Sequence, residues 1–408
     1  MSKSSAIIAR DRRIMSPSLT RDLPFVFQKG SGCYLWDADG KKYLDFTACI
    51  AVNSIGHDNP VIKKAILKQI KYGIHCGFSD VYAETPVLLA ERLLEFMPGF
   101  QKVFLCNSGT ESVEAAYKLA RWHSDRTWTI AFQGAFHGRT MGSLSMTNSK
   151  QVQRERFGPF LPVVHVPYPN AFRMGMEPEE CAQQCLGLLE DRMNAMREDL
   201  AAIFMEPIQG EGGYVVPPAS FVRGVRKLCN EYGALLCDDE VQAGCFRTGK
   251  FLAIENFGVK PDIVSLSKAI GGGMPLGAMV STNAIMDWPK GAHANTFGGN
   301  LLACAGGIAT LEFMKKKKLG ENAVRVGNFI MKELESMKGD IVLDVRGLGL
   351  MIGFEICDKA ERDRILLRAM EKGLILLPAG ESAIRISPPL TITKEQAARG
   401  LGILEECL

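Results

Sequence analysis

The sequence predicts an α/β protein with a mainly parallel sheet and a smaller α+β part at its C-terminal end. Short, fully apolar runs alternate with helical stretches from residue 103 to residue 310, which is typical of parallel strands covered by helices on both faces. The chain has 408 residues, enough for a large domain and a smaller one. Beyond residue 310 the alternation gives way to an α+β pattern.

The N-terminal region is expected to form an arm and then a hairpin. Residues 1–30 are polar and irregular, so we expect an arm there. Two strand-like runs flank Asp39-Gly40 within residues 32–46, which predicts a hairpin. Helices are expected after Pro60 and at 85–96, because apolar residues recur on one face.

The remaining elements follow from the spacing of apolar residues. The expected central strands are 103–106, 129–132, 201–205, 234–237, 263–266 and 277–280. The expected central helices are 111–122, 179–196, 221–232 and 301–313. The C-terminal part is expected to contain helices at 323–337 and around 365, and strands at 341–347, 351–356 and 384–386. We therefore expect an arm and part of a small domain in residues 1–60, a large domain in 61–310 and a C-terminal small domain in 311–408.

The composition is that of an ordinary soluble globular protein, with 47% hydrophobic and 23% charged residues. The net charge of +3 is too small to indicate a nucleic-acid partner. No stretch resembles a signal peptide or is apolar for long enough to span a bilayer, so we expect a cytoplasmic protein without a membrane partner. The twelve cysteines form no CxxC pair, and we expect them to be reduced. Cys181 and Cys185 lie one helical turn apart without a second pair, so no metal site is predicted.

Lys268 draws attention because it follows the apolar strand 263–266 and precedes three glycines at 271–273. Lysine is rarely buried without a partner. A desolvated amine is a good nucleophile that forms a Schiff base with an aldehyde. The alternative is a surface lysine that begins a loop.

Other polar side chains also follow predicted strands, where ligands bind in an open parallel sheet. The turn Asn-Ser-Gly-Thr-Glu at 107–111 opens a helix, so it is either an anion site or a simple N-cap. The acidic run at 238–240 could bind a metal, cap a helix, pair with a cation or face the ring nitrogen of a heteroaromatic cofactor. Arg385 stands in an apolar strand and needs a carboxylate, either from the protein or from a substrate.

Taken together, these stretches resemble the class III, pyridoxal-phosphate-dependent aminotransferases. The matching motifs are NSGTE at 107–111, FHGRT at 136–140, EPIQGEGG at 206–213, DEVQ at 239–242, RTG at 247–249, SK at 267–268, TFGGN at 296–300 and RGLG at 346–349. The resemblance implies fold type I, with a large, mainly parallel seven-stranded domain and a small α+β domain built from both termini.

The resemblance also implies the cofactor-binding residues. Lys268 would hold pyridoxal 5'-phosphate covalently, and Asp239 would keep the pyridine nitrogen protonated, so that the ring acts as an electron sink. The remaining members of the set would hold the phosphate or contact the ring: Gly109, Thr110, Phe136, His137, Val241, Gln242 and Thr296. Thr296 would reach the cofactor of a neighbouring subunit, which predicts a homodimer or a dimer of dimers with shared active sites.

Four further residues are expected to bind the substrates. Arg385 would bind an α-carboxylate, Glu211 would gate it, and Arg139 would bind the distal carboxylate. Ile50 would lie near the substrate, where animal ornithine aminotransferases carry a tyrosine. We expect an ω-amino acid, with 4-aminobutyrate favoured, to donate its amino group to 2-oxoglutarate by a ping-pong mechanism. The alternatives are an acetylornithine or ornithine aminotransferase, or an amino-acid racemase of the same family.

Two other classes fit less well. A non-catalytic binding protein with this fold has no need of Lys268, Asp239 and Gln242 together. A nicotinamide-dependent oxidoreductase would need a glycine-rich turn after its first strand and an acidic residue after its second, and neither stands at the required place.

Overall fold

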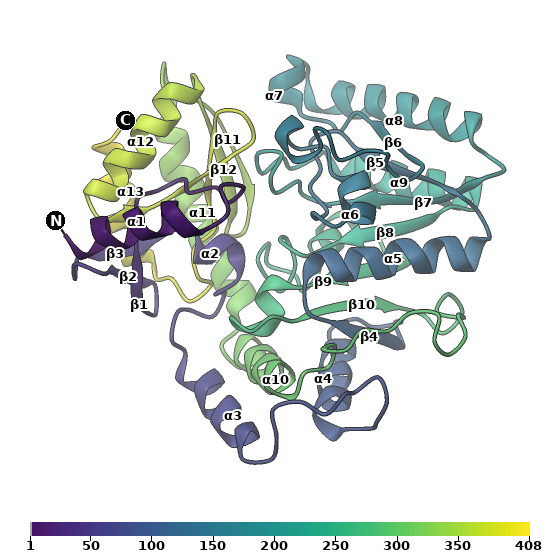
Figure 1. Ribbon diagram of the computed structural model, residues 1–408. Helices are drawn as coiled ribbons and strands as arrows, with labels where there is room; N and C mark the ends of the chain where they lie inside the picture. Colours follow the sequence, from purple (N-terminus) through teal and green to yellow (C-terminus); the bar gives the residue numbers. More distant parts are fainter. Residues whose placement is uncertain (1) are drawn as a thin grey trace.

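The computed structural model describes residues 2–408, and its centre is a seven-stranded sheet (Figure 1). The strand order is β4-β10-β9-β8-β7-β5-β6. The strands are β4 (Lys102–Cys106), β5 (Trp128–Phe132), β6 (Val163–Val166), β7 (Leu200–Met205), β8 (Leu235–Asp239), β9 (Ile263–Leu266) and β10 (Gly277–Ser281). Only β10 runs antiparallel to its neighbours, so the predicted, mainly parallel α/β fold is confirmed.

Burial on both faces explains why these short strands are apolar throughout. Every residue of β7 is buried. Helices pack against the sheet, among them α5 (Gly109–Ser124), α8 (Pro178–Ala195) and α9 (Ala219–Tyr232). The apolar residues of α9 recur at helical spacing, so that one face is buried and the other stays in solvent.

The strand directions bring distant parts of the chain to one edge. The carboxyl ends of β7, β8 and β9 lie together because these strands are parallel. Glu206 follows β7, Asp239 ends β8, and Lys268 follows β9. The sheet therefore gathers two carboxylates and one amine at this edge.

Two small sheets lie beside the large one, and the first joins the two ends of the chain (Figure 1). Its strands are β1 (Phe27–Ser31), β2 (Tyr34–Asp37), β3 (Lys42–Asp45) and β13 (Leu374–Ile375), and β13 pairs in parallel with β3. The second sheet contains β11 (Val342–Leu348), β12 (Met351–Ile356), β14 (Leu377–Ala379) and β15 (Ala383–Ile386). The helices here are α11 (Leu319–Ser336), α12 (Lys359–Glu371) and α13 (Lys394–Glu405). The small α+β part built from both termini is thus present, while its expected boundaries at residues 60 and 310 stay predictions.

Several elements differ from the sequence expectation. Residues 1–30 are not irregular throughout, because α1 (Lys3–Ile14) is helical although none of its residues is buried. The edge strand β6 was not predicted. The expected hairpin at 32–46 is confirmed by β2 and β3. The other helices are α2 (Ala48–Ala51), α3 (Pro60–Ile70), α4 (Glu84–Glu95), α6 (Met141–Met146), α7 (Ala171–Met174) and α10 (Leu301–Lys316).

The described part of the chain contains neither a helix suited to crossing a membrane nor a metal-binding cluster. No helix within residues 2–408 combines the length and the apolar character that a membrane crossing requires. The same residues contain no group of three or more histidine, cysteine, aspartate or glutamate side chains placed to hold a metal ion.

Candidate active site

A cavity of about 260 Å³ opens at the carboxyl edge of the large sheet. Its lining residues are Gly109, Thr110, Phe136, His137, Gly138, Arg139, Glu206, Asp239, Val241, Gln242 and Lys268. All but one of the residues expected to bind the cofactor therefore surround one space, the exception being Thr296. Gly138 and Glu206 join them without having been assigned a role from the sequence.

Lys268 stands in a strained turn at this cavity. Its φ of 44° lies in the left-handed region, which a residue with a side chain seldom adopts. Backbone strain of this kind persists where the surrounding structure enforces it, often at functional sites. Burial lowers the pKa of Lys268, and this effect outweighs the raising effect of the nearby Glu211 and Asp239. A larger fraction of the amine is therefore unprotonated and nucleophilic near neutral pH than in an ordinary lysine.

The carboxylate of Asp239 is held in a fixed orientation. His137 Nδ1 lies 2.7 Å from Asp239 Oδ2, and both side chains are buried. The backbone N–H of Val241 donates to Asp239 Oδ1 at 3.0 Å. Burial is the largest single influence on the pKa of His137 and lowers it. The hydrogen bond and the charge of Asp239 together raise this pKa by more than burial lowers it, so the net shift is upward. The carboxylate thus faces the cavity with lone pairs left for a donor such as a protonated ring nitrogen.

The N-terminus of α5 borders the cavity through Gly109 and Thr110, where it offers backbone N–H groups to an anion. The first N–H groups of a helix have no partner within it, and the helix dipole favours negative charge there. Thr110 Oγ1 adds a hydroxyl and lies 2.6 Å from Ser143 Oγ. At Gly109, a Cβ would lie 2.7 Å from Val241 Cγ1, and at Gly138 a Cβ would lie 2.4 Å from Thr110 Oγ1. Glycine is needed at both positions for the backbone to approach this closely.

Glu206 links two backbone segments next to the cavity by hydrogen bonds. Its carboxylate accepts from the N–H of Phe136 and from that of Gly210, each at 2.8 Å. Burial raises the pKa of Glu206 to about 7, against the lowering effect of His137. The sequence contained the signal for this residue, since Glu206 follows β7 in the same way that Asp239 ends β8.

The buried Arg385 and the largely buried Glu211 form an ion pair next to this wall. Burial raises the pKa of Glu211, but the charge of Arg385 outweighs it, so the pKa is lowered and the carboxylate is ionised. Arg385 Nε is buried without a hydrogen-bond partner within residues 2–408. The loop that carries Glu211 packs closely against the lining residue Gln242, since a Cβ on Gly210 would lie 2.4 Å from Gln242 Nε2. Because Arg385 Nε has no partner, the guanidinium of Arg385 keeps donor capacity for a second carboxylate.

The remaining residues predicted to bind substrate or cofactor are placed differently. Arg139 lines the cavity, and its guanidinium carbon lies 5.4 Å from the ring centroid of Phe136. Thr296 does not line this cavity and is exposed in the segment before α10. Ile50 does not line it either, and it lies on α2.

The backbone around Ile50 is unusual, because the residues from Ala48 to Ala51 have φ values of 45–60°. A left-handed turn of this kind costs about 1–2 kcal/mol per residue, so other contacts must hold it. Asp45 Oδ1 accepts from the N–H groups of Thr47 and Ala48, at 2.8 Å and 3.2 Å. Asp45 Oδ2 lies 2.6 Å from Nε2 of the buried His57. Nothing in the residue types of 48–51 signals this conformation.

A free amine, an anion cradle and an oriented carboxylate around one cavity serve the chemistry of pyridoxal-phosphate-dependent enzymes, and that is the class which the fold and the site define. Comparison with known proteins identifies the family. The family model "Aminotransferase class-III" matches residues 15–408, so the chain belongs to the class III aminotransferases. Its cofactor is pyridoxal phosphate, which the residues around the cavity fit in charge and in hydrogen-bonding groups.

Individual relatives show how far the likeness extends. The chain is 41% identical to an acetylornithine aminotransferase of Methanosarcina acetivorans, over 98% of this chain and 96% of the relative. It is 37% identical to an alanine/serine racemase of Pyrococcus horikoshii, over 100% and 90%. A solved amine transaminase from an uncultivated Pseudomonas species, in its pyridoxal-phosphate-bound form, superposes with a TM-score of 0.90 at 30% identity and 97% coverage of both chains.

Proposed function

We propose that this protein transfers the amino group of an ω-amino acid to 2-oxoglutarate. The observation that carries the proposal is the buried Glu211–Arg385 pair next to a cavity that is also lined by Arg139. 2-Oxoglutarate has two carboxylates and needs two cations. An ω-amino acid has one carboxylate and leaves one cation to be neutralised.

The ion pair can serve both substrates. With an ω-amino donor, Arg139 binds the carboxylate while Glu211 neutralises Arg385. With 2-oxoglutarate, the side chain of Glu211 turns away and Arg385 binds the α-carboxylate through its remaining donors. One site therefore accepts two differently charged substrates in turn, as a ping-pong reaction requires.

The chain's own residues supply the other steps. Bound pyridoxal phosphate supplies an electron sink. Gly109 and Thr110 would hold the phosphate end, and Asp239 would keep a proton at the ring nitrogen. Lys268 would hold the cofactor, and its amine, when free, would act as a base beside the carbon that must lose its proton.

Within this class, we place N-acetylornithine first as the donor and 4-aminobutyrate second. The acetylornithine aminotransferases among the relatives support the first. Both donors carry one free amine and one carboxylate, which suits one free cation and one neutralised cation. Ornithine carries a second amine. Once Glu211 is paired with Arg385, the cavity's other carboxylates, Glu206 and Asp239, are already engaged by backbone N–H groups and His137.

Replacing Arg385 by alanine tests the assignment of the two cations. We expect the half-reaction with 2-oxoglutarate to lose at least about thirtyfold in rate constant at low substrate, because a lost charged hydrogen-bonding partner typically costs 2 kcal/mol or more. The half-reaction with the ω-amino donor should change much less. Rapid-mixing absorbance measurements on each half-reaction decide this, and equal losses in both would show that the pair does not act as a gate.

We further propose that the enzyme is a homodimer in which Thr296 reaches the cofactor of the other subunit. Exposed apolar side chains support this, namely Phe297 next to Thr296 and, in the segment 67–82, Leu67, Ile70, Tyr72, Ile74, Val81 and Tyr82. The rings of His75 and Phe297 lie 5.2 Å apart, which joins the segment after α3 to the segment that carries Thr296. We expect sedimentation at no less than twice the monomer mass, and an active monomer would contradict the proposal.

A racemase is the second candidate, because a named alanine/serine racemase matches the whole chain. Racemisation uses the same cofactor and returns the proton to the α-carbon. It needs no 2-oxo acid and therefore no exchange between two carboxylate arrangements. Loss of optical rotation from an α-amino acid without any oxo acid would favour this candidate.

A further inference from the structure

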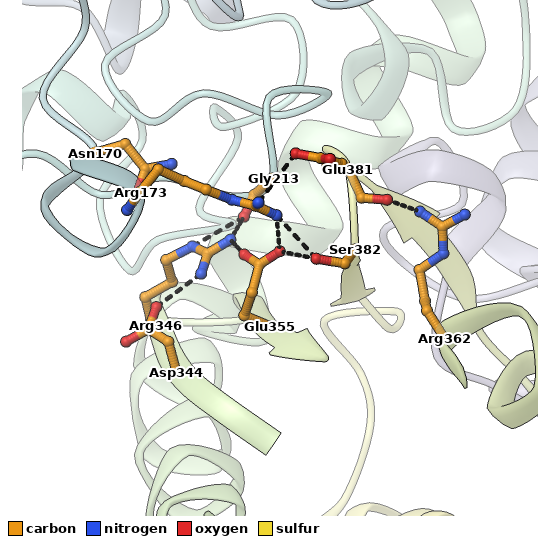
Figure 2. A network of polar contacts seen from close by, with 9 residues as sticks. All are labelled: Asn170, Arg173, Gly213, Asp344, Arg346, Glu355, Arg362, Glu381 and Ser382. Atoms are coloured by element: carbon orange, nitrogen blue, oxygen red, sulfur yellow. Dashed lines mark hydrogen bonds and ion pairs between the residues drawn. The ribbon is translucent and has the colours of Figure 1, made fainter. Parts of the chain in front are cut away.

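A network of ion pairs lies beside the loop that carries Glu211 (Figure 2). Its centre is Glu355 of β12, whose side chain is only 2% exposed. Arg346 Nη2 donates to Glu355 Oε2 at 2.7 Å. Ser382 Oγ donates to Glu355 Oε1 at 2.8 Å, and Arg173 of α7 donates to the same oxygen. Two arginines from distant parts of the chain thus share one buried carboxylate.

Arg346 connects this carboxylate to the backbone of the loop. Its Nε and Nη2 donate to the carbonyl oxygen of Gly213, at 3.0 Å and 2.6 Å. Gly213 comes two residues after Glu211 and has a φ of 119°. A Cβ on Gly213 would lie 3.1 Å from Arg346 Nη2, so glycine permits the close approach. The position of this carbonyl therefore depends on the Arg346–Glu355 pair.

The rest of the loop backbone is also held. The N–H of Gly380 donates to the carbonyl oxygen of Glu211 at 2.8 Å. The N–H of Gly210 donates to Glu206. With the backbone fixed before, at and after Glu211, rotation of the Glu211 side chain is the motion that remains.

Arg173 extends the network across a cleft. It pairs with Glu381 at 3.0 Å as well as with Glu355. Arg173, Glu381 and Gly212 all line a cleft of about 1200 Å³. Because α7 lies beside the large sheet and Glu355 lies in a small one, the network joins two parts of the molecule next to the loop (Figure 1, Figure 2).

We propose that Glu355 is a positioning residue for the Glu211–Arg385 pair, acting through Arg346 on the loop backbone. This inference rests on the proposed function, because it concerns the pair that admits the two substrates in turn. Arg385 lies on β15 directly opposite Gly353 of β12, two residues from Glu355. The same strand β12 therefore sets the position of Arg385 and, through Glu355, that of Glu211.

Loss of the charge on Glu355 has a specific consequence. Burial raises the pKa of Glu355, but Arg346, Ser382 and Arg173 outweigh it, so the pKa is lowered and the carboxylate is ionised during turnover. In Glu355→Gln, Arg346 keeps its pair with Asp344 and Arg173 keeps its pair with Glu381, but both lose the buried anion between them, so Arg346 holds Gly213 less firmly. Glu211 then neutralises Arg385 less well. An ω-amino donor should bind less productively beside an unmasked cation, while L-glutamate should gain from a freer Arg385.

The test compares two donors in single-turnover reactions of the holoenzyme. We expect the ratio of kcat/KM for N-acetylornithine or 4-aminobutyrate to kcat/KM for L-glutamate to fall about tenfold in Glu355→Gln, of the size that a charged hydrogen bond contributes. The matched control is Glu361→Gln, which breaks the Glu361–Arg364 pair on α12 away from the loop. That variant should keep the wild-type ratio. Equal losses for both donors in Glu355→Gln would mean that Glu355 has only a structural role and would overturn the proposal.

A milder variant covers the case in which Glu355→Gln does not fold. Ser382→Ala removes one hydrogen bond to Glu355 and one to Arg173, so the ratio should fall in the same direction by about two- to threefold. An unchanged ratio there would overturn the proposal. A wild-type enzyme that reacts with no ω-amino donor would refute the proposed function and this inference together. A wild-type enzyme that does react, with an unchanged ratio in the variants, would refute this inference alone.

Discussion

Replacing Lys268 by alanine is expected to abolish covalent attachment of the cofactor and to reduce turnover by at least about a thousandfold. A positioned base alone contributes 10²–10⁴-fold, and Lys268 is proposed to act both as that base and as the point of attachment. The fold should survive, because the substitution removes an amine at a cavity and leaves the apolar strand β9 intact. Mass spectrometry after borohydride reduction measures the attachment, and rapid-mixing absorbance measures turnover.

Lys260→Ala is the matched control, because Lys260 is an exposed lysine that shortly precedes β9 in the sequence and does not line the cavity. It should retain both the adduct and the activity. The pH dependence of cofactor attachment to the cofactor-free enzyme gives a second readout. Because burial lowers the pKa of Lys268, the rate of attachment should rise with pH through a pKa below that of an ordinary lysine. A Lys268→Ala enzyme that still carries the cofactor covalently and turns over would contradict the assignment.

Asp239→Asn is expected to have the second largest effect, a loss of about a hundredfold or more in both half-reactions. The change keeps the shape of the side chain, and an amide oxygen can still accept from the N–H of Val241. It removes the negative charge proposed to hold a proton at the ring nitrogen, and electrostatic groups at the reacting centre are typically worth 10²–10³ in rate. Cofactor binding and circular dichroism should show that the fold is retained.

Asp262→Asn provides the control for this change. Asp262 directly precedes β9, at the opposite edge of the large sheet from Asp239, where it pairs with Arg226 at 2.7 Å and does not line the cavity. Its substitution should lower the stability of the fold slightly and leave the rates of both half-reactions almost unchanged. Similar rates in Asp239→Asn and the wild-type enzyme would show that the cofactor ring does not depend on this carboxylate.

The large sheet and the cavity could be predicted from the sequence for physical reasons. Strands β7, β8 and β9 are buried on both faces, so their sequences are largely apolar and stand out. Parallel strands end at one edge, and polar residues directly after them meet there without any knowledge of side-chain contacts. Asp239 and Lys268 were found in this way, and Glu206 could have been.

Other features depend on contacts between distant residues. Helix α1 has no buried face to produce a pattern. The left-handed turn at 48–51 contains no glycine and is held by Asp45, which the local sequence does not reveal. The Arg173–Glu355 pair joins residues that are 182 positions apart. In each case the folded structure, and not the local residue pattern, determines the conformation.

The central claim is that the site accepts an ω-amino donor and 2-oxoglutarate in turn. A single-turnover absorbance spectrum of the yellow holoenzyme tests it most directly, with N-acetylornithine, 4-aminobutyrate, ornithine and then L- and D-amino acids added separately. We expect one ω-amino acid, N-acetylornithine first, to bleach the yellow colour rapidly and 2-oxoglutarate to restore it. If ω-amino acids leave the spectrum unchanged while an α-amino acid loses its optical rotation without any oxo acid, the protein is a racemase and the central claim is wrong.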